Sequence, residues 1–127
     1  MPASQLFFYA LLGLILLVYL RRKLLARGIP QYDAATVAAQ MKNREGLLLL
    51  DVRSSQERSR GHIPGSTHIA LHQLKSRLPE IEKFRDKEIV CYCMSGSRSL
   101  AAASILRKNG FRSANLSGGI SSWPAGV

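Results

Sequence analysis

The stretch Leu47–Val52 (Leu-Leu-Leu-Leu-Asp-Val) constrains the fold most, because it is apolar without alternation. A strand with one face in solvent alternates apolar and polar side chains, whereas a strand covered on both faces does not. A second stretch, 88–92 (Glu-Ile-Val-Cys-Tyr), is β-branched and aromatic and follows a charged turn, so we predict a buried strand there as well. Two such strands indicate a parallel sheet with helices on either side.

Helix and turn signals alternate with strand signals along the rest of this region. Asp33 is a predicted N-cap for a helix from Ala34 to about Lys42, and 54–57 (Ser-Ser-Gln-Glu) is a capping box that begins a short helix. Further predicted elements are an edge strand at 29–32, a brief strand at 66–69, a helical segment at 71–85 interrupted by Pro79, a helix at 99–108, a strand at 113–116 and a sharp turn at 117–119. This alternation predicts an α/β layered domain.

The N-terminal segment differs from this domain in composition. Residues 1–20 contain no charged side chain, and 6–20 are apolar apart from one glycine and two tyrosine tips. As a helix, 6–20 would span roughly 22 Å, compared with a hydrocarbon core of about 30 Å, so flanking residues must cover the difference. We predict a short tail at 1–5 and one transmembrane anchor at 6–20.

Basic residues follow the apolar segment. A signal peptide carries its positive charge before the apolar run, and a core helix shows a polar face, so both alternatives fit less well than an anchor. Lys and Arg beside a span favour the cytoplasmic side. We therefore expect a single-pass membrane protein with its N-terminus outside, a basic juxtamembrane linker at 21–28 and a cytoplasmic domain at 29–127. The cleaved signal peptide remains an alternative.

The whole chain has 18 basic and 8 acidic residues, a formal net charge of +10. Four of the basic residues lie in the juxtamembrane cluster Arg21, Arg22, Lys23 and Arg27, which leaves the domain basic as well. This surplus is compatible with anionic lipid, an acidic protein or small anionic substrates. It shows no patterned basic face, so no nucleic-acid partner is predicted.

Cysteine and histidine spacing gives no sign of a metal site. The two cysteines, Cys91 and Cys93, cannot form a disulfide framework, and the three histidines at 62, 68 and 72 do not combine with them into a zinc-binding spacing. We predict no metal and no cofactor.

The loop 93–98 (Cys-Met-Ser-Gly-Ser-Arg) leaves a predicted strand and opens a predicted helix. Unpaired backbone N–H groups and the helix dipole stabilise an anion at that point, so Cys93 should ionise more readily than a free cysteine. Arg98 can place its guanidinium on an anionic substrate or beside the sulfur, and Gly96 allows close backbone approach. The alternative is an ordinary buried thiol beside a solvated arginine.

Asp51 and Arg53 follow a strand and should lie at the same sheet edge as Cys93. We expect them to pair and cap turns rather than to contact substrate. Similarly, we expect His62 to hydrogen-bond the backbone of the turn that follows it. We expect Trp123 to pack against the core rather than to line a pocket. We expect Cys91 to be a small core residue rather than a partner for oxidised Cys93.

The order of these motifs resembles the single-domain rhodaneses, or rhodanese-like sulfurtransferases, over about residues 29–125. The motifs are Leu50-Asp51-Val52-Arg53, Glu57 followed by Gly61-His62-Ile63-Pro64-Gly65-Ser66, Tyr92-Cys93 with Ser95-Gly96 and Arg98-Ser99, Gly110-Phe111, and Leu116 followed by Gly118-Gly119-Ile120 and Trp123. The resemblance implies a five-stranded parallel sheet flanked by helices. It also implies that Cys93 is the sulfur-carrying nucleophile, with Met94, Ser95, Gly96, Ser97 and Arg98 as substrate-binding residues and Asp51, Arg53 and Ser99 in support.

The implied chemistry is a relay of sulfane sulfur. Cys93 would take the outer sulfur of a small sulfur-containing anion or a persulfide, and pass it to a thiol, cyanide or a protein acceptor, with no general base beside the cysteine. A protein could also be the donor. Thiosulfate-using rhodaneses commonly place basic side chains in this loop, whereas Met94 follows the cysteine here, so thiosulfate is expected to be a poor donor. Phosphatases and arsenate reductases of this fold have five residues between cysteine and arginine; here there are four.

Two further functions stay open at this point. One is a non-catalytic rhodanese-like docking module at the membrane, and the other is a thiol redox sensor that uses Cys91 and Cys93.

Overall fold

The computed structural model describes residues 1–26, 28–43 and 46–124. In these residues the strands are β1 (Gln31–Tyr32), β2 (Leu47–Asp51), β3 (Thr67–His68), β4 (Glu88–Tyr92) and β5 (Arg112–Leu116). The α-helices are α1 (Ala3–Ala26), α2 (Ala34–Lys42), α3 (Ser55–Ser59), α4 (Leu74–Arg77) and α5 (Ser97–Lys108), and the 3₁₀ helices are η1 (Leu71–Gln73), η2 (Leu78–Phe84) and η3 (Gly119–Ser122).

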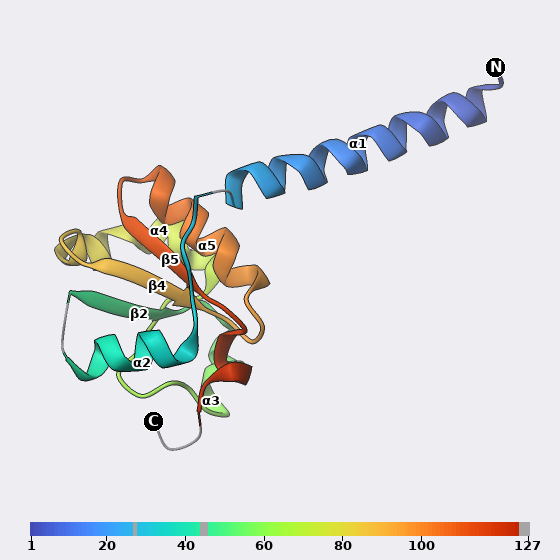
Figure 1. Cartoon of the computed structure of the whole chain (residues 1–127). Helices are drawn as coiled ribbons and strands as arrows, with labels where there is room; N and C mark the ends of the chain where they lie inside the picture. Colours follow the sequence, from blue (N-terminus) through green and yellow to red (C-terminus); the bar gives the residue numbers. More distant parts are fainter. Residues whose placement is uncertain (27, 44–45, 125–127) are drawn as a thin grey trace.

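The five strands form one parallel sheet in the order β1-β5-β4-β2-β3. α2 covers one face of the sheet, and α4 and α5 cover the other (Figure 1). The predicted α/β fold with a five-stranded parallel sheet is confirmed.

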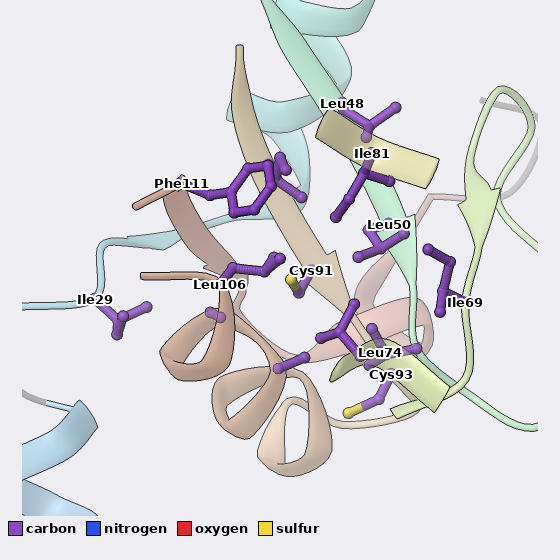
Figure 2. Close-up of a cluster of buried hydrophobic side chains, with 14 residues drawn as sticks. Ile29, Leu48, Leu50, Ile69, Leu74, Ile81, Cys91, Cys93, Leu106 and Phe111 are labelled. Carbon is purple, nitrogen blue, oxygen red and sulfur yellow. The ribbon is translucent and has the colours of Figure 1, made fainter. Parts of the chain in front are cut away.

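The central strand β4 explains why the sequence shows no alternation. Ile89 and Cys91 point into the cluster beneath α4 and α5, whereas Val90 and Tyr92 point into the cluster beneath α2. Figure 2 shows the first cluster, in which Cys91 packs among aliphatic side chains and Cys93 lies at its edge. Both faces of β4 are therefore buried, as a strand between two helical layers requires.

Short sequence motifs predict where most of the helices and strands begin. Asp33 caps α2 by accepting a hydrogen bond from the backbone N–H of Thr36 at 2.8 Å, and the predicted capping box of Ser54 and Glu57 opens α3. The helical segment at 71–85 is divided into η1, α4 and η2, with Pro79 in the first turn of η2, because proline has no N–H to continue the preceding helix. α5 begins two residues earlier than predicted.

α1 is longer than the predicted anchor at both ends. Its candidate membrane-spanning section, Ala3–Leu24, has 22 residues and a mean hydropathy of 2.1, and none of it is buried against the rest of the molecule. At 1.5 Å per residue this section is about 33 Å long, which is enough to cross a hydrocarbon core. α1 extends away from the sheet domain and is a candidate membrane anchor (Figure 1).

Candidate active site

Cys93 directly follows β4, and three residues later the chain turns into α5. Gly96 makes this turn with a φ of +116°, a conformation that side chains other than glycine rarely adopt. The loop is held from outside by η3: the backbone N–H of Ile120 donates to the carbonyl oxygen of Cys93 at 2.9 Å, and that of Ser121 donates to Met94 at 3.2 Å. A five-residue strand and two backbone hydrogen bonds therefore fix the position of the cysteine.

The sulfur of Cys93 is almost fully buried, with 1% of the residue exposed. The backbone N–H of Gly96 donates to Sγ at 3.1 Å, and Ser99 Oγ lies 3.4 Å from Sγ. Burial alone would raise the pKa of Cys93, but hydrogen bonds from Ser99 and from the backbone of Gly96 and Ser95 outweigh it, so the pKa lies below its ordinary value. Among the described residues, no basic side chain is hydrogen-bonded to the sulfur, which lies instead against the backbone N–H of Gly96 and the Ser99 hydroxyl.

Asn115 in β5 is a further residue of this site, and sequence reasoning missed it. Its amide nitrogen donates to Gln31 Oε1 at 2.9 Å and to the carbonyl oxygen of Gly96 at 3.3 Å, so its Oδ1 is the acceptor for Ser99 Oγ at 2.6 Å. Asn115 is 3% exposed. The only sequence signal is a polar residue inside the predicted strand at 113–116; since the strand is buried in the structure, this residue has a fixed hydrogen-bonding role.

Arg98 does not place its guanidinium on the sulfur. It forms two hydrogen bonds with the carboxylate of Glu57, at 2.7 Å and 2.9 Å, so the fork that sequence analysis assigned to a substrate or to the sulfur is occupied by an acidic side chain. The bond from Arg98 is the main reason why the pKa of Glu57 falls to about 2. The only charged side chain of the loop is therefore neutralised by a residue of α3.

Asp51 and Arg53 pair with each other behind the loop. The Arg53 guanidinium donates to both carboxylate oxygens of Asp51, at 3.0 Å and 2.9 Å, and Tyr92 Oη donates to the same carboxylate at 3.0 Å. Burial opposes ionisation of Asp51, but these bonds hold its pKa below the ordinary value. Arg53 also donates to the carbonyl oxygen of Gly61 at 2.7 Å, so this buried pair ties the end of β2 to the turn after α3.

His62 does not hold the turn as expected. It is exposed, and the backbone N–H of Ile63 instead donates to Tyr92 Oη at 3.1 Å. Cys91 is fully buried, which raises the pKa of its thiol, and it belongs to the core as predicted. Trp123 is half-buried and packs against the cluster beneath α2.

A cavity of about 370 Å³ adjoins the loop. Met94, which is 47% exposed, lines this cavity together with Glu57 and Ile120. The exposed side chains of Arg60 and His62 also line it. Within the described residues, no three His, Cys, Asp or Glu side chains cluster as metal ligands would. The arrangement offers a polarised thiol, backbone donors around it, and an open space beside Met94.

Similarity to known proteins covers most of the globular part of the chain. The sequence profile of the family described as Rhodanese-like domain matches residues 34–125. A protein of Allochromatium vinosum named Sulfurtransferase is 34% identical over 96 residues, which cover 75% of this chain and 88% of that protein. β1 lies before the profile match but belongs to the same sheet.

Solved structures agree with this similarity. The crystal structure of a rhodanese-related protein from Thermoplasma volcanium has a TM-score of 0.67 and 32% identity, covering 74% of this chain and 89% of that one. A rhodanese-like domain protein from Staphylococcus aureus has a TM-score of 0.70 at 21% identity, covering 76% and 92%, and supports the fold alone. The profile match runs from α2 to η3 and includes four of the five strands and the Cys93 loop, and the chain therefore belongs to the rhodanese-like domain family.

Proposed function

We propose that the chain is a membrane-anchored sulfurtransferase in which Cys93 accepts sulfane sulfur as a persulfide and passes it on. The observation that carries this proposal is the surroundings of Cys93 Sγ: a backbone N–H at 3.1 Å, a serine hydroxyl at 3.4 Å, and a lowered thiol pKa in a nearly buried position. These features favour ionisation of the Cys93 thiol and supply donors to the anion. Membership of the family and the sulfurtransferase of Allochromatium vinosum support sulfur transfer in general.

In the first step the Cys93 thiolate attacks the outer sulfur of the donor. The new S–S bond forms as the old one breaks, and the leaving group departs with its electron pair, as a thiolate from a persulfide or as sulfite from thiosulfate. In the second step an acceptor nucleophile, such as a thiolate, attacks the outer sulfur of the Cys93 persulfide. That S–S bond breaks and Cys93 regains its negative charge, so no proton transfer at the loop is required.

The loop residues would hold the terminal sulfur. In this proposal the backbone N–H groups from Met94 to Ser97 hold it, and the cavity that Met94 lines is its route to an acceptor. The only guanidinium of the loop is paired with Glu57, so the loop offers little net positive charge to a dianion. We infer that low-molecular-weight persulfides or a protein persulfide are better donors than thiosulfate.

The disulfide-based sensor is disfavoured by the burial of Cys91. Its thiol is fully buried in the middle of β4, and burial raises its pKa, so it is a poor nucleophile toward an oxidised Cys93. The proposed topology places the N-terminus outside, the apolar part of α1 across the membrane, and the domain 29–127 in the cytoplasm. The basic segment 21–28 joins the two and begins within α1.

The test is intact-mass measurement of the full chain in detergent micelles, before and after treatment with glutathione persulfide or thiosulfate. We expect a gain of one sulfur atom that cyanide or excess thiol removes, with glutathione persulfide the better donor. Cys93→Ser should abolish the gain, and Cys91→Ala, which removes only the buried thiol, should retain it. No adduct from either donor on folded protein would contradict the proposal and favour the docking module.

A further inference from the structure

A groove of about 470 Å³ lies between the basic end of α1 and the outer face of α5. Its walls are largely apolar and include Leu71, Leu100 and Ile105. Two cationic side chains, Arg22 from α1 and Lys108 from the last turn of α5, also line it. The groove touches the Cys93 loop only at Ser97 and Arg98, and the proposed sulfur transfer makes no use of the rest.

Gly28 and Ile29, which follow α1 closely in the sequence, both contact α5 or the cluster beneath it. Arg107 of α5 donates a hydrogen bond to the carbonyl oxygen of Gly28, and Ile29 is buried in the cluster beneath α5. Arg22, which lines the groove together with α5, is two positions after Leu20, the last residue of the apolar run, which is about 3 Å of helix. The polar headgroup layer extends roughly 5 to 8 Å beyond the hydrocarbon core. If α1 spans a membrane, α5 must therefore lie beside the headgroups.

The charges in the groove are available to a ligand. Within the described part of the chain, no carboxylate forms an ion pair with Arg22 or Lys108. Arg98, at the end of the groove nearest the loop, is instead held by Glu57. A ligand that suits the groove therefore carries a negative charge for two cations and apolar groups for the walls formed by Leu71 and Ile105.

We propose that this groove binds the headgroup of an anionic phospholipid. The phosphate lies between Arg22 and Lys108, and the glycerol and first acyl methylenes lie against Ile105 and Leu71. This inference rests on the membrane anchor of the proposed function. A free phosphate would leave the apolar walls exposed to water, and an acidic peptide would have to compete with the membrane surface for a groove that lies beside it.

The test uses the full chain and native mass spectrometry. The protein is released from mixed micelles that contain equal amounts of phosphatidylglycerol and phosphatidylcholine. We expect one phosphatidylglycerol to be retained in preference to phosphatidylcholine, and Lys108→Gln to weaken its retention about fivefold, the effect of one cation at a membrane surface. Lys42→Gln is the matched control, because Lys42 is also an exposed last residue of its helix, and that helix, α2, covers the opposite face of the sheet (Figure 1).

Three results would overturn the lipid site. These are equal retention of both lipids, equal weakening by Lys108→Gln and Lys42→Gln, and displacement of phosphatidylglycerol by soluble glycerol phosphate or an acidic peptide at equal concentration. Sulfur loading with glutathione persulfide on the same samples separates this inference from the proposed function. Loss of lipid preference with normal loading of Cys93 overturns the groove alone, and lipid preference without loading overturns the sulfur transfer alone.

Discussion

Ser99 Oγ donates a hydrogen bond to Asn115 Oδ1 across 2.6 Å while it lies 3.4 Å from Cys93 Sγ. A serine hydroxyl has one proton, and the amide of Asn115 is fixed by its two donor bonds, so this proton points to Asn115 while Cys93 is a thiol. When Cys93 ionises, the thiolate becomes a second acceptor for the same hydroxyl. Ser99 therefore responds to the charge of the sulfur, and Asn115 sets its starting position.

Ser99→Ala should make Cys93 less reactive at neutral pH. Removing the hydroxyl takes away one donor to the thiolate, so the thiol pKa rises and we expect iodoacetamide to alkylate Cys93 about threefold more slowly at pH 7. The midpoint of the alkylation rate against pH should move upward. Ser104→Ala, which removes a hydroxyl that donates to the carbonyl oxygen of Leu100 on the same helix, is the control and should leave the profile unchanged. An unchanged profile in Ser99→Ala would show that the backbone donors alone set the pKa.

Glu57→Gln should improve the use of thiosulfate. The substitution leaves a side chain of similar size but removes the negative charge that neutralises Arg98, so the guanidinium can attract a dianionic donor. We expect kcat/KM for thiosulfate to rise about fivefold and that for glutathione persulfide to change less. Glu80→Gln breaks a comparable ion pair with Arg77 on the surface and serves as the control. An equal change for both donors would argue against a role of this pair in donor choice.

The same pair should contribute to stability in a defined pH range. The pKa of Glu57 is lowered from 4.5 to about 2 in the folded protein, chiefly by its bond to Arg98. A carboxyl whose folded pKa is depressed stabilises the protein above the unfolded pKa, and this contribution is lost as the pH falls through the folded pKa. The Tm of Glu57→Gln should therefore lie below that of the unmodified chain at pH 6, and the difference should shrink between pH 4.5 and pH 2. A constant difference over that range would assign the effect to packing.

Much of the fold could be predicted because its signals are local. The cap at Asp33, the capping box at Ser54 and the apolar run in β2 each lie within a few residues of the element that they define. The partners of the site could not be predicted in this way. Glu57 is 41 residues from Arg98, and Asn115 is 16 residues from Ser99, so only the packed sheet brings each pair together.

The misplaced expectations have the same origin. The sequence predicts that the Arg98 guanidinium contacts the Cys93 sulfur or a substrate, because Arg98 and Cys93 share a loop. In the structure the Glu57 carboxylate, from α3, accepts its hydrogen bonds instead. His62 was expected to hold its own turn, but Tyr92 reaches that turn from β4. In both positions a distant residue of the folded chain replaces the neighbour that a local pattern would choose.

Gly119→Ala should disturb the Cys93 loop from outside. Gly119 has a φ of +60°, and a Cβ built on it would lie 2.4 Å from the carbonyl oxygen of Cys93. Either η3 or the loop must move, so we expect a loss of about 1 to 3 kcal/mol in the free energy of unfolding and a marked loss of sulfur loading. Gly46→Ala, where an added Cβ meets nothing within 4 Å, is the matched control for urea unfolding and for loading. Normal loading in Gly119→Ala would show that the loop does not depend on contact with η3.

The proposed topology predicts opposite labelling of two engineered cysteines. Ser4 is exposed near the start of α1, and Lys42 is exposed at the end of α2, on the other side of the proposed span. With basic residues only on the C-terminal side of the apolar run, a membrane-impermeant maleimide should label Ser4→Cys in intact cells and Lys42→Cys only after permeabilisation. Both variants carry Cys93→Ser, so that label on the reactive thiol does not contribute. Labelling of Lys42→Cys in intact cells would place the domain outside, and recovery of a chain shortened at its N-terminus would identify the segment as a cleaved signal peptide.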